Sequence, residues 1–142
     1  MTPGEPALDE IYKEVILDHY RSPRNRGHLE RSTASADGLN PLCGDEIHLE
    51  LLVEDDRILG VAFTGRGCSI SQSSASMMTE AIEGLAPAEA LRKIGAFKAL
   101  MTGGEHEDLG DLDALSGVAK LPVRVKCATL AWNTLKQALD QS

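Results

Sequence analysis

The chain has 142 residues, and its 14 Lys and Arg against 22 Asp and Glu give a formal net charge of −8. This length fits a single domain over residues 1–142, with residues 1–7, rich in Pro and Gly, as a flexible N-terminus. The negative charge disfavours nucleic acid as a partner. No apolar run approaches the roughly 18 residues of a membrane span. The N-terminal residues lack a secretory pattern, which favours a cytoplasmic protein with reduced thiols.

The first predicted element is an amphipathic helix that begins near Leu8 and runs through His19, before Pro23 ends it. Residues 21–40 are polar and indicate a loop, with a possible short strand near Ser32–Gly38. Alternating apolar and polar residues then predict a strand over residues 47–53. We expect it to form a hairpin with a second strand that starts at Ile58.

Three helices are predicted in the second half of the chain. The first starts with Ser69 as N-cap and Gln72 as its capping-box partner, and ends near Gly84. The next runs from Pro87 toward Gly103, and the last helix carries Cys127. Between them, the acidic residues 105–113 lack periodicity and indicate a solvated segment. Because strands precede helices, we expect an α+β fold rather than alternating βαβ units.

Three cysteines lie in short segments flanked by Gly or Pro. Cys43 precedes Gly44 and Asp45, and a glycine there would let both side chains turn toward one point. An ordinary turn is the competing interpretation. Cys68 lies at the predicted start of a helix, where backbone N–H groups and the macrodipole favour a thiolate. A small buried residue at a strand–helix joint is the alternative for Cys68.

The third cysteine, Cys127, lies near the start of the last helix, with Arg124 three residues earlier on the same face. A guanidinium at that position could lower the thiol pKa or pair with Asp45. Taken alone, this segment favours a core cysteine, because Leu130 and Ala131 share its apolar face.

Together, the cysteines and Asp45 form a possible metal site. Three thiolates and one carboxylate suit a tetrahedral metal such as zinc, provided that the fold brings them together. The histidines are weaker candidates. We expect His19 to be packed or at the surface, and His28, His48 and His106 to lie in loops or on polar faces.

Five segments resemble the IscU/NifU N-terminal family of iron–sulfur cluster assembly proteins, and most closely its SufU branch. They are Leu8–Tyr12, His19–Asn25, Asn40–Asp45, Gly65–Ser71 and Leu121–Ala128. The resemblance spans nearly the whole chain and keeps the segments in order. It implies a three-stranded antiparallel sheet with helices packed on it.

The resemblance also implies a site and a partner. Cys43, Asp45, Cys68 and Cys127 would converge at one exposed end and hold zinc. A cysteine desulfurase of the SufS type would pass persulfide sulfur to Cys43, and iron–sulfur assembly scaffold proteins would act downstream.

Two features separate this chain from the IscU branch. Lys126 stands immediately before the third cysteine, where that branch carries His, and the chaperone-binding motif of that branch is altered at Leu121–Lys126. Conversely, Gly103–Lys120 resembles an insertion of the SufU branch, and Arg124 also fits that branch.

The main hypothesis is therefore a zinc-dependent sulfur acceptor, in which a docking desulfurase displaces one zinc ligand and frees Cys43 as nucleophile. Arg124 would stabilise the displaced arrangement. Whether such a carrier counts as an enzyme, a sulfurtransferase, stays open. One alternative is a scaffold that holds iron or a labile [2Fe–2S] cluster on the same thiolates. Another is a structural zinc domain that serves as an interaction module.

Overall fold

The computed structural model describes residues 5–105 and 107–141. In chain order its elements are α1 (Glu5–Arg21), β1 (Ala34–Asn40), β2 (Asp45–Glu54), β3 (Arg57–Arg66), α2 (Ser69–Ile82), α3 (Pro87–Met101), the 3₁₀ helix η1 (Gly110–Lys120) and α4 (Pro122–Leu139). None of the helices described is long and apolar enough to cross a membrane.

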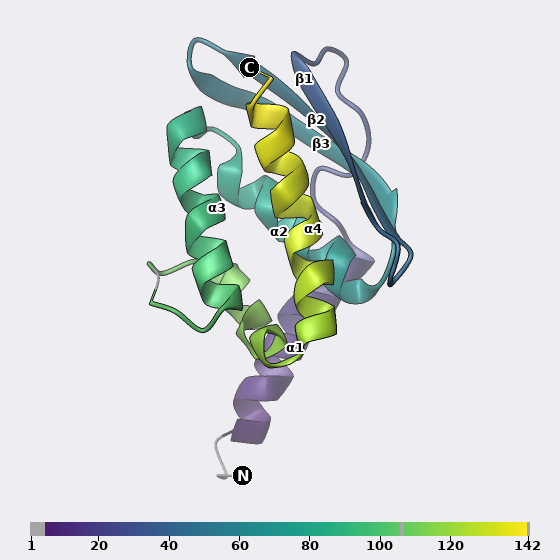
Figure 1. The fold of residues 1–142 in the computed structure, drawn as a ribbon, viewed down its shortest axis with the longest axis vertical. Coiled ribbons are helices and arrows are strands. Elements are labelled where there is room, and N and C mark those ends of the chain that lie inside the picture. Colours follow the sequence, from purple (N-terminus) through teal and green to yellow (C-terminus); the bar gives the residue numbers. More distant parts are fainter. Residues whose placement is uncertain (1–4, 106, 142) are drawn as a thin grey trace.

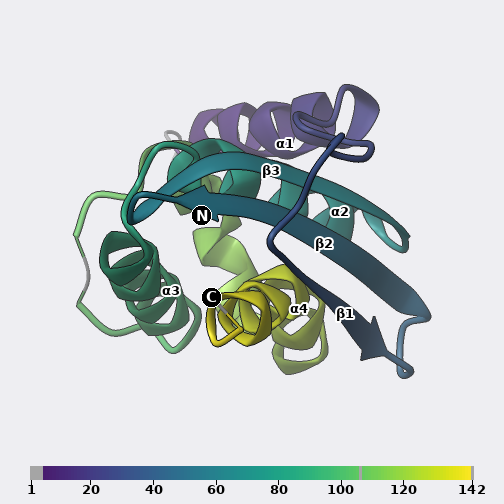
Figure 2. The ribbon, with the colours of Figure 1, turned by 90° about the horizontal axis from the view of Figure 1, so that it is seen from above.

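The strands form one antiparallel sheet in the order β1-β2-β3, and helices cover one of its faces (Figures 1 and 2). α4 packs against β1 and β2, while α2 packs against β3. α1 lies on α2, and α3 lies on α4. The expected α+β class with a three-stranded sheet is confirmed.

The face that the sheet presents to the helices follows from the alternation in β2. Ile47, Leu49 and Leu51 are all buried, and Asp45 lies on the same face at the start of the strand. The core continues into α4, where the Trp132 ring stacks on Phe97 at 4.6 Å between centroids. Because Asp45 shares the inward face with this core, its carboxylate points toward the helices rather than toward solvent.

Several element boundaries differ from the sequence-based expectation. β1 runs to Asn40, beyond the predicted short strand. α1 includes residues 5–7, which were expected to be flexible, while residues 1–4 lie outside the described part of the chain. The N-cap of α2 is Cys68 rather than Ser69. The capping-box prediction was wrong by one residue because a thiol can accept the backbone N–H bond that usually goes to a hydroxyl.

The acidic segment was expected to be solvated, and its described acidic side chains are exposed or partly exposed. The backbone of its second half, however, is ordered and not a loop. There the chain forms η1, which packs against α1, α2, α3 and α4. Leu109 and Leu112 are buried among these helices. Apolar residues spaced by three in a 3₁₀ helix share one face, and the surrounding acidic residues hide that short pattern in the sequence.

Candidate metal centre

The four proposed ligands come from three places in the sequence that the fold brings to one end of the sheet. Cys43 lies in the β1–β2 turn, where its N–H donates to Asn40 O at 3.3 Å. Gly44 has a φ of 69°, in the left-handed region that glycine adopts readily, which agrees with the tight turn expected between Cys43 and Asp45. Asp45 begins β2, Cys68 caps α2, and Cys127 lies in the second turn of α4.

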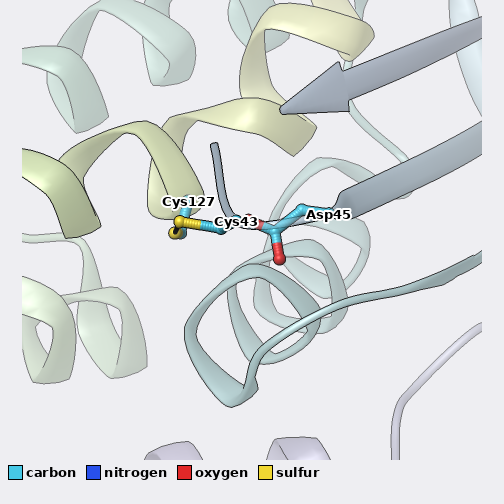
Figure 3. A group of neighbouring side chains, drawn as sticks. All are labelled: Cys43, Asp45 and Cys127. Carbon is cyan, nitrogen blue, oxygen red and sulfur yellow. Dashed lines mark hydrogen bonds between the residues drawn. The ribbon is translucent and has the colours of Figure 1, made fainter. Parts of the chain in front are cut away.

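Cys43, Asp45 and Cys127 form a close group (Figure 3). One ligand atom from each lies within 4.8 Å of the other two, and the sulfurs of Cys43 and Cys127 are 3.3 Å apart. This separation is far longer than the roughly 2.05 Å of a disulfide bond. It is close to the roughly 3.8 Å that two sulfurs keep when both bind one tetrahedral zinc.

The carboxylate of Asp45 is fully buried and held by hydrogen bonds. Its Oδ1 accepts from the Cys68 N–H at 3.0 Å and from the Ser71 hydroxyl at 3.2 Å. Its Oδ2 accepts from the Asn40 amide at 3.3 Å, and the same amide lies 3.8 Å from Cys127 Sγ. These bonds fix the orientation of the carboxylate, so that Oδ2 lies on the side of the Cys127 thiol.

Cys68 lies beside this group but not within it. Its Sγ accepts the Ser71 N–H at 3.5 Å and thereby caps α2. The position at a helix N-terminus, expected from the sequence, is confirmed. A sulfur there faces the backbone N–H groups at the positive end of the helix dipole.

Because Gly67 has no side chain, the Asp45 carboxylate can lie directly beside its backbone. A Cβ on Gly67 would lie 2.3 Å from Asp45 Oδ1 and 2.6 Å from Ser71 Oγ. Its φ of +154° is also one that side chains with a Cβ rarely adopt. The glycine before Cys68 is therefore part of how the site is built.

Two features govern the ionisation of the thiols at the centre: the burial of Cys127 and the nearby guanidinium of Arg124. Burial raises the pKa of the Cys127 thiol well above its ordinary value, and the neighbouring Cys43 thiol adds to this effect. Arg124 is exposed on the first turn of α4. The negative charge of an ionised Cys68 and then contact with Cys127 raise the pKa of its guanidinium. A cation at the centre would offset the cost of ionising the buried thiol.

Two residues of the site were missed by the sequence reasoning. Asn40 and Ser71 both lie in the segments quoted for the resemblance, yet neither is an obvious ligand. Their role becomes visible only in the structure, where each donates a hydrogen bond to Asp45. A buried amide and a buried hydroxyl beside a carboxylate are typical of the groups that orient metal ligands.

Two of the expected non-ligand histidines lie elsewhere, on the sheet face that helices do not cover. His48 Nδ1 is 2.8 Å from Asp37 Oδ1, and His28 Nδ1 is 2.6 Å from Glu50 Oε2. His106 lies outside the described residues. His19 is buried against α2, so of the two expected positions, packed or at the surface, the packed one is confirmed.

The fold and the site define a small α+β protein with a thiol and carboxylate centre at one end of its sheet. The model of the NifU-like N terminal domain matches residues 11–141, and the chain belongs to this family. The family expected from the sequence is thus confirmed.

Individual relatives agree with this assignment. The zinc-dependent sulfurtransferase SufU of Bacillus subtilis is 47% identical, over 93% of this chain and 91% of its own. The iron–sulfur cluster assembly scaffold protein IscU of Streptococcus pyogenes is 41% identical, over 95% of this chain and 86% of its own. A crystal structure assigned as a SUF-system scaffold protein of Fervidobacterium islandicum superposes with a TM-score of 0.86 at 38% identity, covering 92% of this chain and 97% of that one.

Proposed function

We propose that this protein accepts persulfide sulfur at Cys43 during iron–sulfur cluster assembly and holds zinc at the same centre. The observation that carries the proposal is the convergence of Cys43 and Cys127 with the buried carboxylate of Asp45. Cys43 lies in a turn and is partly exposed, whereas Cys127 is buried in α4. Cys68 is also partly exposed, but its sulfur caps α2, so Cys43 is the reachable thiol that does not support a helix end.

The donor set fits zinc. Sulfur ligands together with one carboxylate match the preferences of this borderline-soft ion. Cys43, Asp45 and Cys127 would hold it with Cys68, whose thiol would exchange the hydrogen bond from Ser71 N–H for the metal. When bound, zinc would keep the thiols deprotonated and protected from oxidation. Support also comes from the Bacillus relative, which is named a zinc-dependent sulfurtransferase.

The transfer step is a thiol exchange with a cysteine desulfurase that carries a persulfide. The Cys43 thiolate attacks the outer sulfur and forms a new S–S bond, while the bond to the desulfurase cysteine breaks. The electron pair of the broken bond leaves with the desulfurase cysteine as its thiolate. Cys43 then carries the persulfide for delivery to a downstream scaffold protein.

Arg124 and the hydrogen-bonded Asp45 prepare the site for this step. The guanidinium, exposed beside Cys68 and Cys127, offsets negative charge at the centre and can pair with Asp45 when that carboxylate is not a ligand. Asn40 and Ser71 hold Asp45 in place while it faces the thiols. Because the chemistry needs reduced thiols, we also propose a cytoplasmic location.

A scaffold for a labile [2Fe–2S] cluster is the second candidate. It is supported by the Streptococcus relative and by one of Thermotoga maritima that is 44% identical, both named iron–sulfur cluster assembly scaffold proteins IscU. The same thiolates suit an iron–sulfur cluster. Lys126 in place of His before Cys127 disfavours this candidate.

Alanine release from cysteine by a desulfurase tests the proposal. In the absence of iron and added thiols, we expect the zinc-loaded protein to increase the rate by at least tenfold. We expect Cys43→Ala to abolish this increase, while Ser32→Ala, an exposed site at the other end of the sheet, leaves it intact. If the wild-type protein gives no increase, the scaffold function gains support. If Cys43→Ala stimulates fully, the acceptor assignment is wrong.

A further inference from the structure

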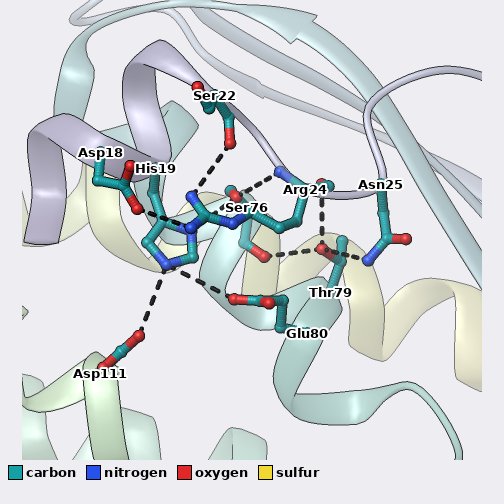
Figure 4. A network of polar contacts seen from close by, with 9 residues as sticks. All are labelled: Asp18, His19, Ser22, Arg24, Asn25, Ser76, Thr79, Glu80 and Asp111. Atoms are coloured by element: carbon teal, nitrogen blue, oxygen red, sulfur yellow. Dashed lines mark hydrogen bonds and ion pairs between the residues drawn. The ribbon is translucent and has the colours of Figure 1, made fainter.

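A second group of possible metal ligands lies away from the cysteines, where α1, α2 and η1 meet. His19 from α1, Glu80 from α2 and Asp111 from η1 each offer one ligand atom within 4.8 Å of the others (Figure 4). Glu80 follows Cys68 by 12 positions along α2, which corresponds to about 18 Å of helix. The group is therefore distinct from the cysteine centre.

His19 is the buried member of this group, with 1% of its surface exposed. Its Nδ1 lies 2.8 Å from the hydroxyl oxygen of Ser76, and that oxygen also accepts the Arg24 N–H at 2.8 Å. The ring is thus fixed through one nitrogen, as metal-binding imidazoles usually are. With Nδ1–H donating to Ser76, the lone pair of Nε2 points toward the two carboxylates.

The distances around Nε2 suit an intervening ion better than direct contact. Nε2 lies 3.6 Å from a Glu80 oxygen and 3.8 Å from an Asp111 oxygen. Both distances exceed the range of a hydrogen bond. Ligands held about 2.1 Å from one tetrahedral zinc lie about 3.4 Å from each other, which is near the separations seen here.

The local charges also favour a cation. Glu80 and Asp111 bring two carboxylates close together, and the nearby Arg24 is paired with Asp18 at 2.6 Å. Burial and the charge of Arg24 lower the pKa of His19, so its neutral form is favoured. Arg24 also lies close enough to offset part of the charge of Glu80 and Asp111, but a neutral imidazole adds no positive charge between the two carboxylates. Both carboxylates also line a surface cavity of about 280 Å³, through which an ion and water could enter.

We propose that His19, Glu80 and Asp111 form a second binding site for a divalent transition metal of the zinc class, completed by water. One imidazole and two carboxylates suit such ions. An ion there would join η1 to α1 and α2. Because η1 leads directly into α4, which carries Arg124 and Cys127, the ion would also fix the start of that helix.

Cadmium NMR of the full-length protein tests this proposal, because sulfur donors and nitrogen or oxygen donors give well separated cadmium resonances. With the metal-free protein titrated by cadmium, we expect one resonance from the thiol centre and a second from a site without sulfur. The two resonances report independently, so failure of the thiol centre would not remove the second one. If the second resonance is absent at saturation, the proposal is wrong, and His19 only forms ion pairs with Glu80 and Asp111.

The variant Glu80→Gln/Asp111→Asn gives the decisive comparison. Both carboxylates are substantially exposed, so the fold is expected to tolerate the change. We expect cadmium affinity at the sulfur-free site to fall at least tenfold. The control Glu83→Gln/Asp108→Asn removes the same two charges from exposed neighbouring positions and should keep the affinity. Equal affinity in the two variants would show adventitious binding and overturn the assignment.

Discussion

At the scale of single residues, Asp45 determines how the centre is arranged. Three hydrogen bonds, from Cys68, Ser71 and Asn40, hold its buried carboxylate against the cysteines. A buried carboxylate that is fixed in this way is ready to bind a cation without loss of side-chain entropy. This is why an aspartate two residues after Cys43 can act together with sulfur ligands.

Asp45→Asn keeps the size of the side chain but removes its charge. We expect zinc affinity to fall at least tenfold, or about 1.4 kcal/mol, because an amide oxygen is a weaker ligand than a carboxylate. Competition with a chromogenic chelator measures this. Glu46→Gln, one residue away and partly exposed, removes the same charge and should leave the affinity unchanged. Equal affinities for the two variants would remove Asp45 from the ligand set.

Arg124 is expected to act on sulfur transfer more than on metal binding. Arg124→Ala should lower the transfer rate about tenfold, equivalent to about 1.4 kcal/mol in the barrier, because negative charge at the thiols loses its partner. Zinc content should stay the same. Lys126→Ala removes an exposed charge two positions away and is the matched control. A similar loss in both variants would indicate a general charge effect rather than a specific role.

At the scale of elements, the start of α2 links the sheet to the centre. Gly67 lets the chain pass beside Asp45, and Cys68 then caps the helix with its own sulfur. The start of α2 was predicted correctly from the sequence, but its N-cap was assigned to Ser69 instead of Cys68. A rule based on hydroxyl caps could not distinguish adjacent Cys and Ser, since only the backbone geometry at Cys68 settles which side chain reaches the Ser71 N–H.

Gly67→Ala tests how strongly this joint is constrained. The added methyl group would overlap Asp45 Oδ1 and Ser71 Oγ, on a backbone that also disfavours it. We expect a loss of about 2 kcal/mol in the free energy of unfolding, measured by denaturant titration, together with weaker zinc binding. Gly95→Ala, in the middle of α3 with open space around it, should instead be neutral or stabilising. Unchanged stability in Gly67→Ala would contradict the packing described.

At the scale of the whole molecule, local patterns were sufficient for α2, α3, α4 and the hairpin, because their periodicity is strong. η1 could not be predicted, since its buried Leu112 and the buried Leu109 just before it lie among acids, and only contacts with distant helices make it ordered. For the centre, residue types and resemblance supplied the four candidate ligands. The supporting bonds from Asn40 and Ser71 depend on the β1–β2 register and on α2, which no local pattern reveals.

The buried thiol of Cys127 links stability to pH across the molecule. Its folded pKa lies above the ordinary 9.0, so in the zinc-free protein the folded state retains a proton that the unfolded state loses. Its contribution to stability is therefore full below pH 9 and decreases as pH rises above that value, by up to about 1.4 kcal/mol per pH unit. Denaturant titrations of the wild type and of Cys127→Ala at several pH values measure this contribution as the difference between their free energies of unfolding. We expect the stability advantage of the wild type to shrink above pH 9, and an advantage that grows with pH would contradict the raised pKa.

The most direct test of the central claim is the site of persulfide formation. The zinc-loaded protein would be incubated with a desulfurase and cysteine, then alkylated, digested and analysed by mass spectrometry. We predict one additional sulfur atom on the peptide that contains Cys43, and none on the peptides of Cys68 or Cys127. An additional sulfur on either of those peptides instead, or on none of the three, would contradict the account.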